Sequence, residues 1–123
     1  KIKKVIMCSG KIYFDLLEAR EKYKRRDVVL LRIEQLYPFP AKSLVKSIKP
    51  YAKNAEFIWC QEEPKNMGAW SHVRDYIQWT LDFIKANNKN VSYIGRAPAA
   101  SPATGYAKRH VAQQKEILEK VFN

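Results

Sequence analysis

The stretch FIWCQEEPKNMGAW, residues 57–70, decides the fold class of this chain. Its first four residues are apolar throughout, as expected for a strand that is covered on both faces. Two carboxylates and a turn with proline and glycine follow, and an amphipathic helix begins at Trp70. In an open α/β sheet, ligands and partner surfaces meet at the carboxyl ends of such strands. The stretch therefore predicts an α/β fold and indicates where a functional site should lie.

Three further pairs of a strand and a helix flank this stretch. Short apolar runs predict strands at residues 5–8, 28–33, 57–60 and 91–94. Apolar residues recur with roughly helical spacing after the runs, and Pro40 and Pro50 delimit the second helix. Alternating strands and helices predict a three-layer α/β domain, with a mostly parallel sheet and helices on both faces.

The apolar faces of the predicted helices can also be read from the spacing. The third helix has the clearest stripe, formed by Trp70, Val73, Tyr76, Ile77, Leu81 and Ile84. The last helix carries Val111, Ile117, Leu118, Val121 and Phe122. These side chains are expected to pack against the sheet.

The length of 123 residues is usual for a single domain, and we expect residues 1–123 to form one. No apolar run approaches the ~18 residues that a membrane-spanning helix requires, so we expect a soluble protein without a membrane partner. The chain begins with Lys1, and no apolar stretch of signal-peptide length follows it. We interpret Lys1 as an artificial boundary rather than a natural start.

The formal net charge of +11 raises the question of a nucleic acid partner, because lysine and arginine neutralise phosphates. The basic residues are spread along the whole chain, mostly where a solvated helix face would place them. We therefore favour a solvated surface, or one that is complementary to an acidic neighbour, and expect no nucleic acid partner.

The two cysteines, Cys8 and Cys60, are each flanked by apolar, strand-like residues. Two isolated thiols without C-x-x-C spacing form neither a zinc site nor a disulfide framework. We expect both to be buried and reduced.

The pair Ser9 and Gly10 lies between a predicted strand and a predicted helix. Free backbone N–H groups at such a junction can hold an anion such as a phosphate. The pair lacks the glycine spacings of dinucleotide-binding and P-loop motifs, however. We favour the simpler interpretation, in which Ser9 caps the helix and Gly10 forms a tight turn.

The adjacent carboxylates Glu62 and Glu63 suggest general acid and base chemistry, since neighbouring carboxylates can split their pKa values. Adjacent residues leaving a strand point to opposite sides, which argues against a shared proton. We favour a surface or interface pair, and we expect His72 to be exposed or hydrogen-bonded rather than a catalytic base. The basic residues Lys108, Arg109 and His110 lie near the start of the last helix. This position is unusual, because the helix dipole disfavours positive charge there.

Several polar residues could converge at the carboxyl edge of the sheet. The candidate interface or effector residues are Ser9, Gly10, Gln61, Glu62, Glu63, Arg96, Ser101, Lys108, Arg109 and His110. An edge that carries both acids and bases on proline-stiffened loops is suited to a partner domain. The more specific alternative to a domain interface is a crevice that binds a phosphorylated effector.

Three separated motifs carry a resemblance to a known family: RIEQLYPFP at residues 32–40, WCQEEPKNMGAW at residues 59–70 and SPATGYAKRH at residues 101–110. Together they resemble the C-terminal domain of the first, thiamine-diphosphate-dependent component of 2-oxoglutarate dehydrogenase. The resemblance extends over nearly the whole chain. It implies a transketolase-type C-terminal domain with a sheet of about five mostly parallel strands, one of which can be antiparallel.

Members of this family are several times longer than this chain, so the resemblance implies that residues 1–123 are a C-terminal fragment of a much longer enzyme. It also implies a function for that enzyme. Family members decarboxylate 2-oxoglutarate on thiamine diphosphate with magnesium, pass the succinyl group to the lipoyl arm of the second component, and act as dimers. Their cofactor and catalytic residues lie in preceding domains, so the resemblance implies no catalytic, cofactor-binding or metal-binding residue in this chain. The implied partners are the remaining domains of the same enzyme, its dimer mate and, through them, the second component. A bacterial cytoplasm or a mitochondrial matrix would fit.

The residues themselves leave a second reading open. A free-standing α/β module that binds a small molecule or an anion would have the same pattern of strands and helices. The reading frame upstream of Lys1 separates the two readings.

Overall fold

The sheet is built from four parallel strands in the order β2-β1-β3-β4 in the computed structural model, which describes residues 1–96 and 107–123. The strands are β1 (Lys4–Cys8), β2 (Val28–Arg32), β3 (Glu56–Pro64) and β4 (Ser92–Arg96). All three pairings are parallel, as the sequence predicted. The fifth strand that the resemblance implied is not present among the described residues.

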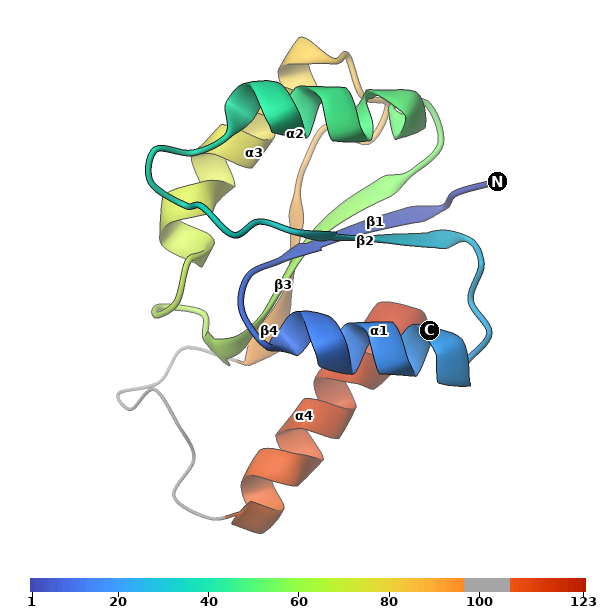
Figure 1. The fold of residues 1–123 in the computed structure, drawn as a ribbon, viewed down its shortest axis with the longest axis vertical. Helices are drawn as coiled ribbons and strands as arrows, with labels where there is room; N and C mark the ends of the chain where they lie inside the picture. Colours follow the sequence, from blue (N-terminus) through green and yellow to red (C-terminus); the bar gives the residue numbers. More distant parts are fainter. Residues whose placement is uncertain (97–106) are drawn as a thin grey trace.

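The helices lie in two layers, one on each face of the sheet (Figure 1). They are α1 (Ile12–Lys22), α2 (Ala41–Ile48), the short 3-10 helix η1 (Lys49–Tyr51), α3 (Trp70–Phe83) and α4 (Ala107–Phe122). Helices α2 and α3 cover one face, and α1 and α4 cover the other. The predicted three-layer α/β class is confirmed.

The two central strands divide the core into two clusters, because successive side chains of a strand point to opposite faces. Met7 and Trp59 belong to the cluster under α2 and α3, whereas Cys8 and Cys60 belong to the cluster under α1 and α4. All four side chains are fully buried. The apolar runs of the sequence are therefore strands that are covered on both faces, as predicted.

Some residues predicted to be buried are exposed. On α3, Tyr76 is 45% exposed and Ile84 is only partly buried, while Thr80 is fully buried instead. On α4, Val111 is 65% exposed. The prediction was wrong at Tyr76 because apolar residues follow two faces of α3, and helical spacing alone does not say which face meets the sheet.

The side chain of Leu81 provides a test of this core, because it is fully buried in the cluster beneath α2 and α3. We expect Leu81→Ala to lower the free energy of unfolding by about 2–5 kcal/mol, through lost burial and the cavity that remains. Val111→Ala is the control, since its exposed side chain should change the stability by about 0.5 kcal/mol or less. Urea unfolding of both variants measures the difference, and similar small losses would place Leu81 outside the core.

Candidate functional site

A cleft of about 310 Å³ lies at the carboxyl edge of the sheet. It is lined by Ser9, Gly10, Leu36, Trp59, Gln61, Glu63, Gly68, Ala69 and His72. Four of the residues that the sequence placed at this edge, namely Ser9, Gly10, Gln61 and Glu63, therefore share one cleft. They come together because β1 and β3 are parallel neighbours, so that the chain leaves both strands at the same edge.

The centre of this edge is the side chain of Gln61, which is only 2% exposed. Its Oε1 accepts a hydrogen bond from Trp59 Nε1 at 2.9 Å and another from the backbone N–H of Trp70 at 3.0 Å. The second bond satisfies an N–H group in the first turn of α3, where the local cap residue Ala69 provides no side-chain acceptor. Gln61 thus joins the end of β3 to the start of α3.

The amide nitrogen of Gln61 holds the connection between β3 and α3. Nε2 donates to the carbonyl of Pro64 at 2.9 Å and to that of Met67 at 2.8 Å, and it lies 3.2 Å from the carbonyl of Glu63. Both ends of the buried amide therefore have partners inside the domain. The sequence placed Gln61 among interface residues, but its polar atoms serve the fold.

The turn also depends on Gly68, which has a φ of +66°. A Cβ atom at this position would lie 3.0 Å from Glu63 Oε1 and 3.1 Å from Gln61 Nε2. Glycine is suited to both constraints, since it adopts positive φ without strain and has no side chain.

Arg96, at the end of β4, also makes its contacts within the domain. Its Nε donates to the carbonyl of Glu62 at 2.7 Å, and its Nη1 lies 3.3 Å from Gln113 Oε1 on α4. The hydroxyl of Tyr93 donates to the carbonyl of Arg96 at 2.8 Å, and burial raises the pKa of this tyrosine to about 12. Arg96 thus links β3, β4 and α4.

Ser9 and Gly10 take different parts at the junction of β1 and α1. Gly10 has a φ of +80°, so its predicted role as a turn residue is confirmed. The predicted capping role of Ser9 is wrong, because the N-cap of α1 is Lys11 and no side chain caps this helix. The turn extends one residue further than the sequence suggested, which moves Ser9 away from the cap position.

His72 lies on α3 and closes one side of the cleft. Its Nε2 is 2.6 Å from the carbonyl of Leu36, so Nε2 carries the hydrogen and donates it. This hydrogen bond confirms that His72 is tied to the fold. The carboxylate of Glu63 is exposed, whereas Glu62 is half-buried.

Four candidate residues are not placed with their side chains. Ser101 lies outside the described residues, and Lys108, Arg109 and His110 belong to the first turn of α4, whose described side chains begin at Val111. Their predicted place at the carboxyl edge stays a prediction.

Both cysteines are free and buried, as predicted. Burial raises the pKa of Cys8 to about 12 and also raises that of Cys60. A thiol of this kind is protonated near neutral pH and therefore a poor nucleophile. Among the described residues, no group of three His, Cys, Asp or Glu side chains could hold a metal ion. No helix in this part of the chain has the length and hydrophobicity needed to cross a membrane.

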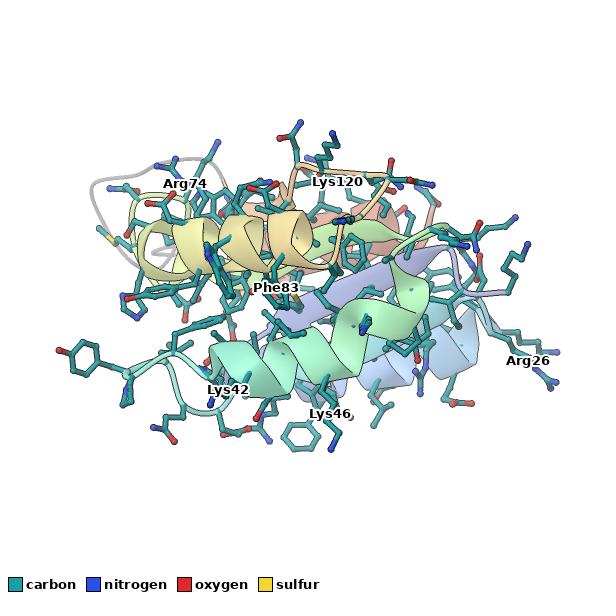
Figure 2. All side chains as sticks on the ribbon, turned by 90° about the horizontal axis from the view of Figure 1, so that it is seen from above. Arg26, Lys42, Lys46, Arg74, Phe83 and Lys120 are labelled. Carbon is teal, nitrogen blue, oxygen red and sulfur yellow. The ribbon has the colours of Figure 1, made fainter. Side chains whose placement is uncertain are left out.

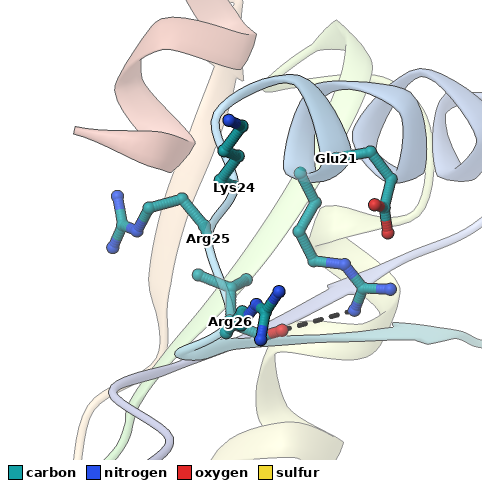
Figure 3. Close-up of a pocket in the computed structure, with 6 residues that line it drawn as sticks. Glu21, Lys24, Arg25 and Arg26 are labelled. Carbon is teal, nitrogen blue, oxygen red and sulfur yellow. Dashed lines mark hydrogen bonds between the residues drawn. The ribbon is translucent and has the colours of Figure 1, made fainter.

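A second cleft, of about 460 Å³, lies at the opposite, amino edge of the sheet (Figure 3). It is lined by Arg20, Glu21, Lys24, Arg25, Arg26 and Val28. Arg20 Nη1 donates to the carbonyl of Val28 at 3.3 Å. Arg25 makes two hydrogen bonds to Asp27, at 2.8 Å and 3.1 Å, which lower the pKa of Asp27 to about 2.

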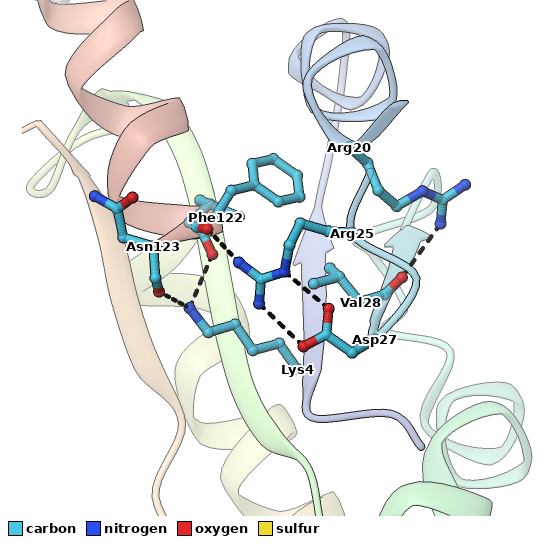
Figure 4. Close-up of polar contacts among 8 residues, drawn as sticks. Lys4, Arg20, Arg25, Asp27, Val28, Phe122 and Asn123 are labelled. Atoms are coloured by element: carbon cyan, nitrogen blue, oxygen red, sulfur yellow. Dashed lines mark hydrogen bonds and ion pairs between the residues drawn. The ribbon is translucent and has the colours of Figure 1, made fainter. Parts of the chain in front are cut away.

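Basic side chains at this edge also cap the end of α4 (Figure 4). Lys4 Nζ donates to the carbonyls of Val121 and Asn123, at 2.9 Å and 3.0 Å. Arg25 Nη1 donates to the carbonyl of Phe122. These bonds satisfy carbonyl groups that have no partner within the helix and fix the end of α4 beside β1.

The position of these cations explains part of the net charge of +11. Helices that connect parallel strands run opposite to them, so their carboxyl ends gather at the amino edge of the sheet. Cations are stabilised beside the partial negative charge of such helix ends. The last turns of α1, α2 and α4 contain Arg20, Lys22, Lys46 and Lys120. The same helix ends disfavour a bound anion, so we assign these cations to the fold.

Comparison with known proteins agrees with the resemblance found in the sequence. The model of the family described as 2-oxoglutarate dehydrogenase C-terminal matches residues 1–122. The 2-oxoglutarate dehydrogenase E1 components of Brucella anthropi, Brucella ovis and Brucella canis are each 55% identical to the chain over 119 residues. This similarity covers 97% of the chain but only 12% of each relative, so the chain spans about an eighth of their length.

The hydrogen bonds of Gln61 can be tested by removing its amide. We expect Gln61→Leu to lower the free energy of unfolding by about 2 kcal/mol or more, because the buried N–H groups of Trp59 and Trp70 lose their acceptor. Gln114→Leu is the matched control, since Gln114 Nε2 donates to Asp15 Oδ2 in an exposed contact, and it should change stability by about 0.5 kcal/mol or less. Urea unfolding of both variants measures their stability. Equal losses of stability in the two variants would contradict the role of Gln61.

The buried thiol of Cys8 predicts a dependence of stability on pH. Because folding raises its pKa, the thiol favours the folded state most at low pH, and this contribution is lost as the pH rises from about 8.5 towards 12. From pH 7 to pH 10, the chain should lose about 2 kcal/mol more than a Cys8→Ala variant. Unfolding curves for both proteins at the two pH values measure this, and parallel losses would show that the thiol titrates normally.

Proposed function

The chain belongs to the 2-oxoglutarate dehydrogenase C-terminal family, and on that premise we propose that it is a non-catalytic assembly domain of an E1 component. The observation that carries the proposal is the family match over residues 1–122. The polar groups of the carboxyl edge support it, because Gln61 and Arg96 are engaged in holding loops and strands together. We assign no step of the reaction to this chain.

We propose that the longer protein decarboxylates 2-oxoglutarate on thiamine diphosphate with magnesium. It then passes the succinyl group to the lipoyl arm of a second component. Its cofactor is bound by other domains. The partners are then those domains, a dimer mate and the second component, in a bacterial cytoplasm or a mitochondrial matrix. The named relatives are bacterial, which favours the cytoplasm.

The carboxyl edge is the surface through which we propose that this domain meets the rest of the enzyme. Internal hydrogen bonds hold its framework, while Glu63 near the end of β3 and Lys65 and Asn66 just after it expose their side chains. A rigid loop with exposed charges can pair with a neighbour at low entropic cost. The proposal extends to Ser101 and to Lys108, Arg109 and His110, which the sequence placed at the same edge.

The alternative is a free-standing module that binds a small molecule or an anion. The cleft of about 310 Å³ beside Ser9 and His72 is the observation that favours it. The coding sequence upstream of Lys1 distinguishes the two functions. A thiamine-binding region supports the assembly domain, and a start codon next to Lys1 supports the alternative.

Turnover of the longer polypeptide tests the proposal. We expect it to consume 2-oxoglutarate only with thiamine diphosphate and magnesium, and we expect Glu63→Ala to weaken its assembly. Removing one partner of an interfacial charge pair typically costs about 2–5 kcal/mol, so dimer dissociation should increase at least about tenfold. Analytical ultracentrifugation and a turnover assay provide the two measurements.

The matched control is Glu18→Ala. It removes an exposed carboxylate from α1, which covers the face of the sheet opposite to α3. It should leave dissociation and turnover within about twofold of the parent. Absence of turnover in the parent enzyme would overturn the proposed function. Normal turnover with no difference between Glu63→Ala and Glu18→Ala would remove only the assembly role of this edge.

A further inference from the structure

Helix α3 carries a second apolar stripe that faces away from the core. His72, Tyr76, Trp79 and Phe83 are spaced by four, three and four residues, which places them within about 60° of one another around a helix. The three aromatic residues are 45%, 53% and 62% exposed, respectively. The buried residues Val73, Ile77 and Leu81 occupy a separate face of the same helix.

Two residues of the connection between β2 and α2 extend this stripe. The ring of Phe39 stacks on that of Tyr76 with centroids 5.0 Å apart, and the ring of Tyr37 lies 6.2 Å from that of His72. Tyr37 is 84% exposed. On the other side, Trp79 and Phe83 stack with centroids 5.2 Å apart. We call Tyr37, Phe39, His72, Tyr76, Trp79 and Phe83 the aromatic face.

Of the aromatic face, Figure 2 labels Phe83, which lies on α3, and it labels Lys42 and Lys46 on the neighbouring α2. The face follows α3 from His72, which lines the cleft at the carboxyl edge, to Phe83 at the end of the helix. Ring contacts join Tyr37, His72, Tyr76 and Phe39 in one group and Trp79 and Phe83 in another. Monomeric proteins rarely expose contiguous apolar patches of this kind, and aromatic residues are enriched in the cores of interfaces. The stacked pairs fix the orientation of several rings before any partner arrives, which lowers the entropic cost of binding.

We propose that the aromatic face is a docking surface for another domain of the same longer polypeptide. The inference rests on the proposed function and names a second surface, on the outer side of α3 rather than at the carboxyl edge of the sheet. The length of the relatives supports it, because the chain corresponds to only 12% of each and the remainder provides a large neighbouring surface.

A second copy of this chain fits the face less well. Pairing through this face would bring together two domains that each carry a net charge of +11, and like charge opposes such pairing. Lys42 and Lys46 are exposed on α2, the neighbour of α3, and add positive charge to this side of the domain. A patch of apolar side chains with carboxylates opposite α2 is the surface that would complement this one.

Cysteine labelling in the full-length polypeptide tests the proposal. Phe83→Cys places a thiol within the aromatic face, at the last residue of α3 and in the tryptic peptide of residues 75–85, which has no native cysteine. Phe14→Cys is the matched control, because Phe14 is 55% exposed on α1 and its tryptic peptide, residues 12–20, also lacks cysteine. Mass spectrometry of the two peptides follows their modification by a maleimide.

We expect the thiol at position 83 to react at least about tenfold more slowly than the thiol at position 14, because an interface core excludes solvent and reagent. Both thiols should react at similar rates in urea. Equal rates in the native protein would overturn the proposal. Trp79→Cys, in the same peptide, repeats the measurement should Phe83→Cys fail to fold.

Cross-linking then identifies the occupant. A photoreactive phenylalanine analogue at position 83 is activated in a mixture of isotopically heavy and light full-length proteins. We expect cross-links from position 83 to residues outside this domain, with both cross-linked peptides carrying the same isotope label. Cross-links that combine heavy and light chains would assign the face to a dimer mate and overturn the proposal. Turnover of the same protein is measured in parallel, so that an active enzyme with an unprotected thiol rejects this inference and leaves the proposed function standing.

Discussion

The parallel pairing of the strands is the constraint on which the rest of this structure depends. Parallel neighbours require a crossover helix after each strand, and the helices must return in the opposite direction. All strands therefore end at one edge of the sheet, and the carboxyl ends of the helices gather at the other. The first edge holds the cleft around Gln61, and the second holds the basic residues that include Lys4 and Arg25. One geometric rule thus separates the polar groups of the chain into two sets.

The two edges use their polar groups differently. At the amino edge, cations neutralise helix ends, and Arg25 also pairs with Asp27, so that part of the positive charge serves the fold. At the carboxyl edge, the buried amide of Gln61 satisfies two N–H groups of β3 and α3 and the carbonyls of the turn between them. Leaving such buried groups unpaired would cost more free energy than a neutral hydrogen bond contributes to stability. These hydrogen bonds therefore hold this edge rigid.

Rigidity at the carboxyl edge and apolar exposure on α3 are consistent with a domain that works by contact. The groups exposed there include Glu63, near the end of β3, and the aromatic face on α3. Both are presented by elements that the core holds in place, since Trp70 and Leu81 anchor α3 to the sheet. The domain therefore offers its neighbours two preformed surfaces, one polar and one aromatic.

The sequence by itself determined the fold class, the four strands and the burial of both cysteines, because continuous apolar runs and helical spacing are local patterns that survive without tertiary information. The resemblance carried by its motifs also determined the family. Only the tertiary structure decided which face of α3 meets the sheet, since Tyr76 and Ile77 are both apolar and differ only in direction. It likewise showed that Gln61 is buried and that Ser9 does not cap α1, because these facts depend on partners that lie elsewhere in the chain or on the length of a turn.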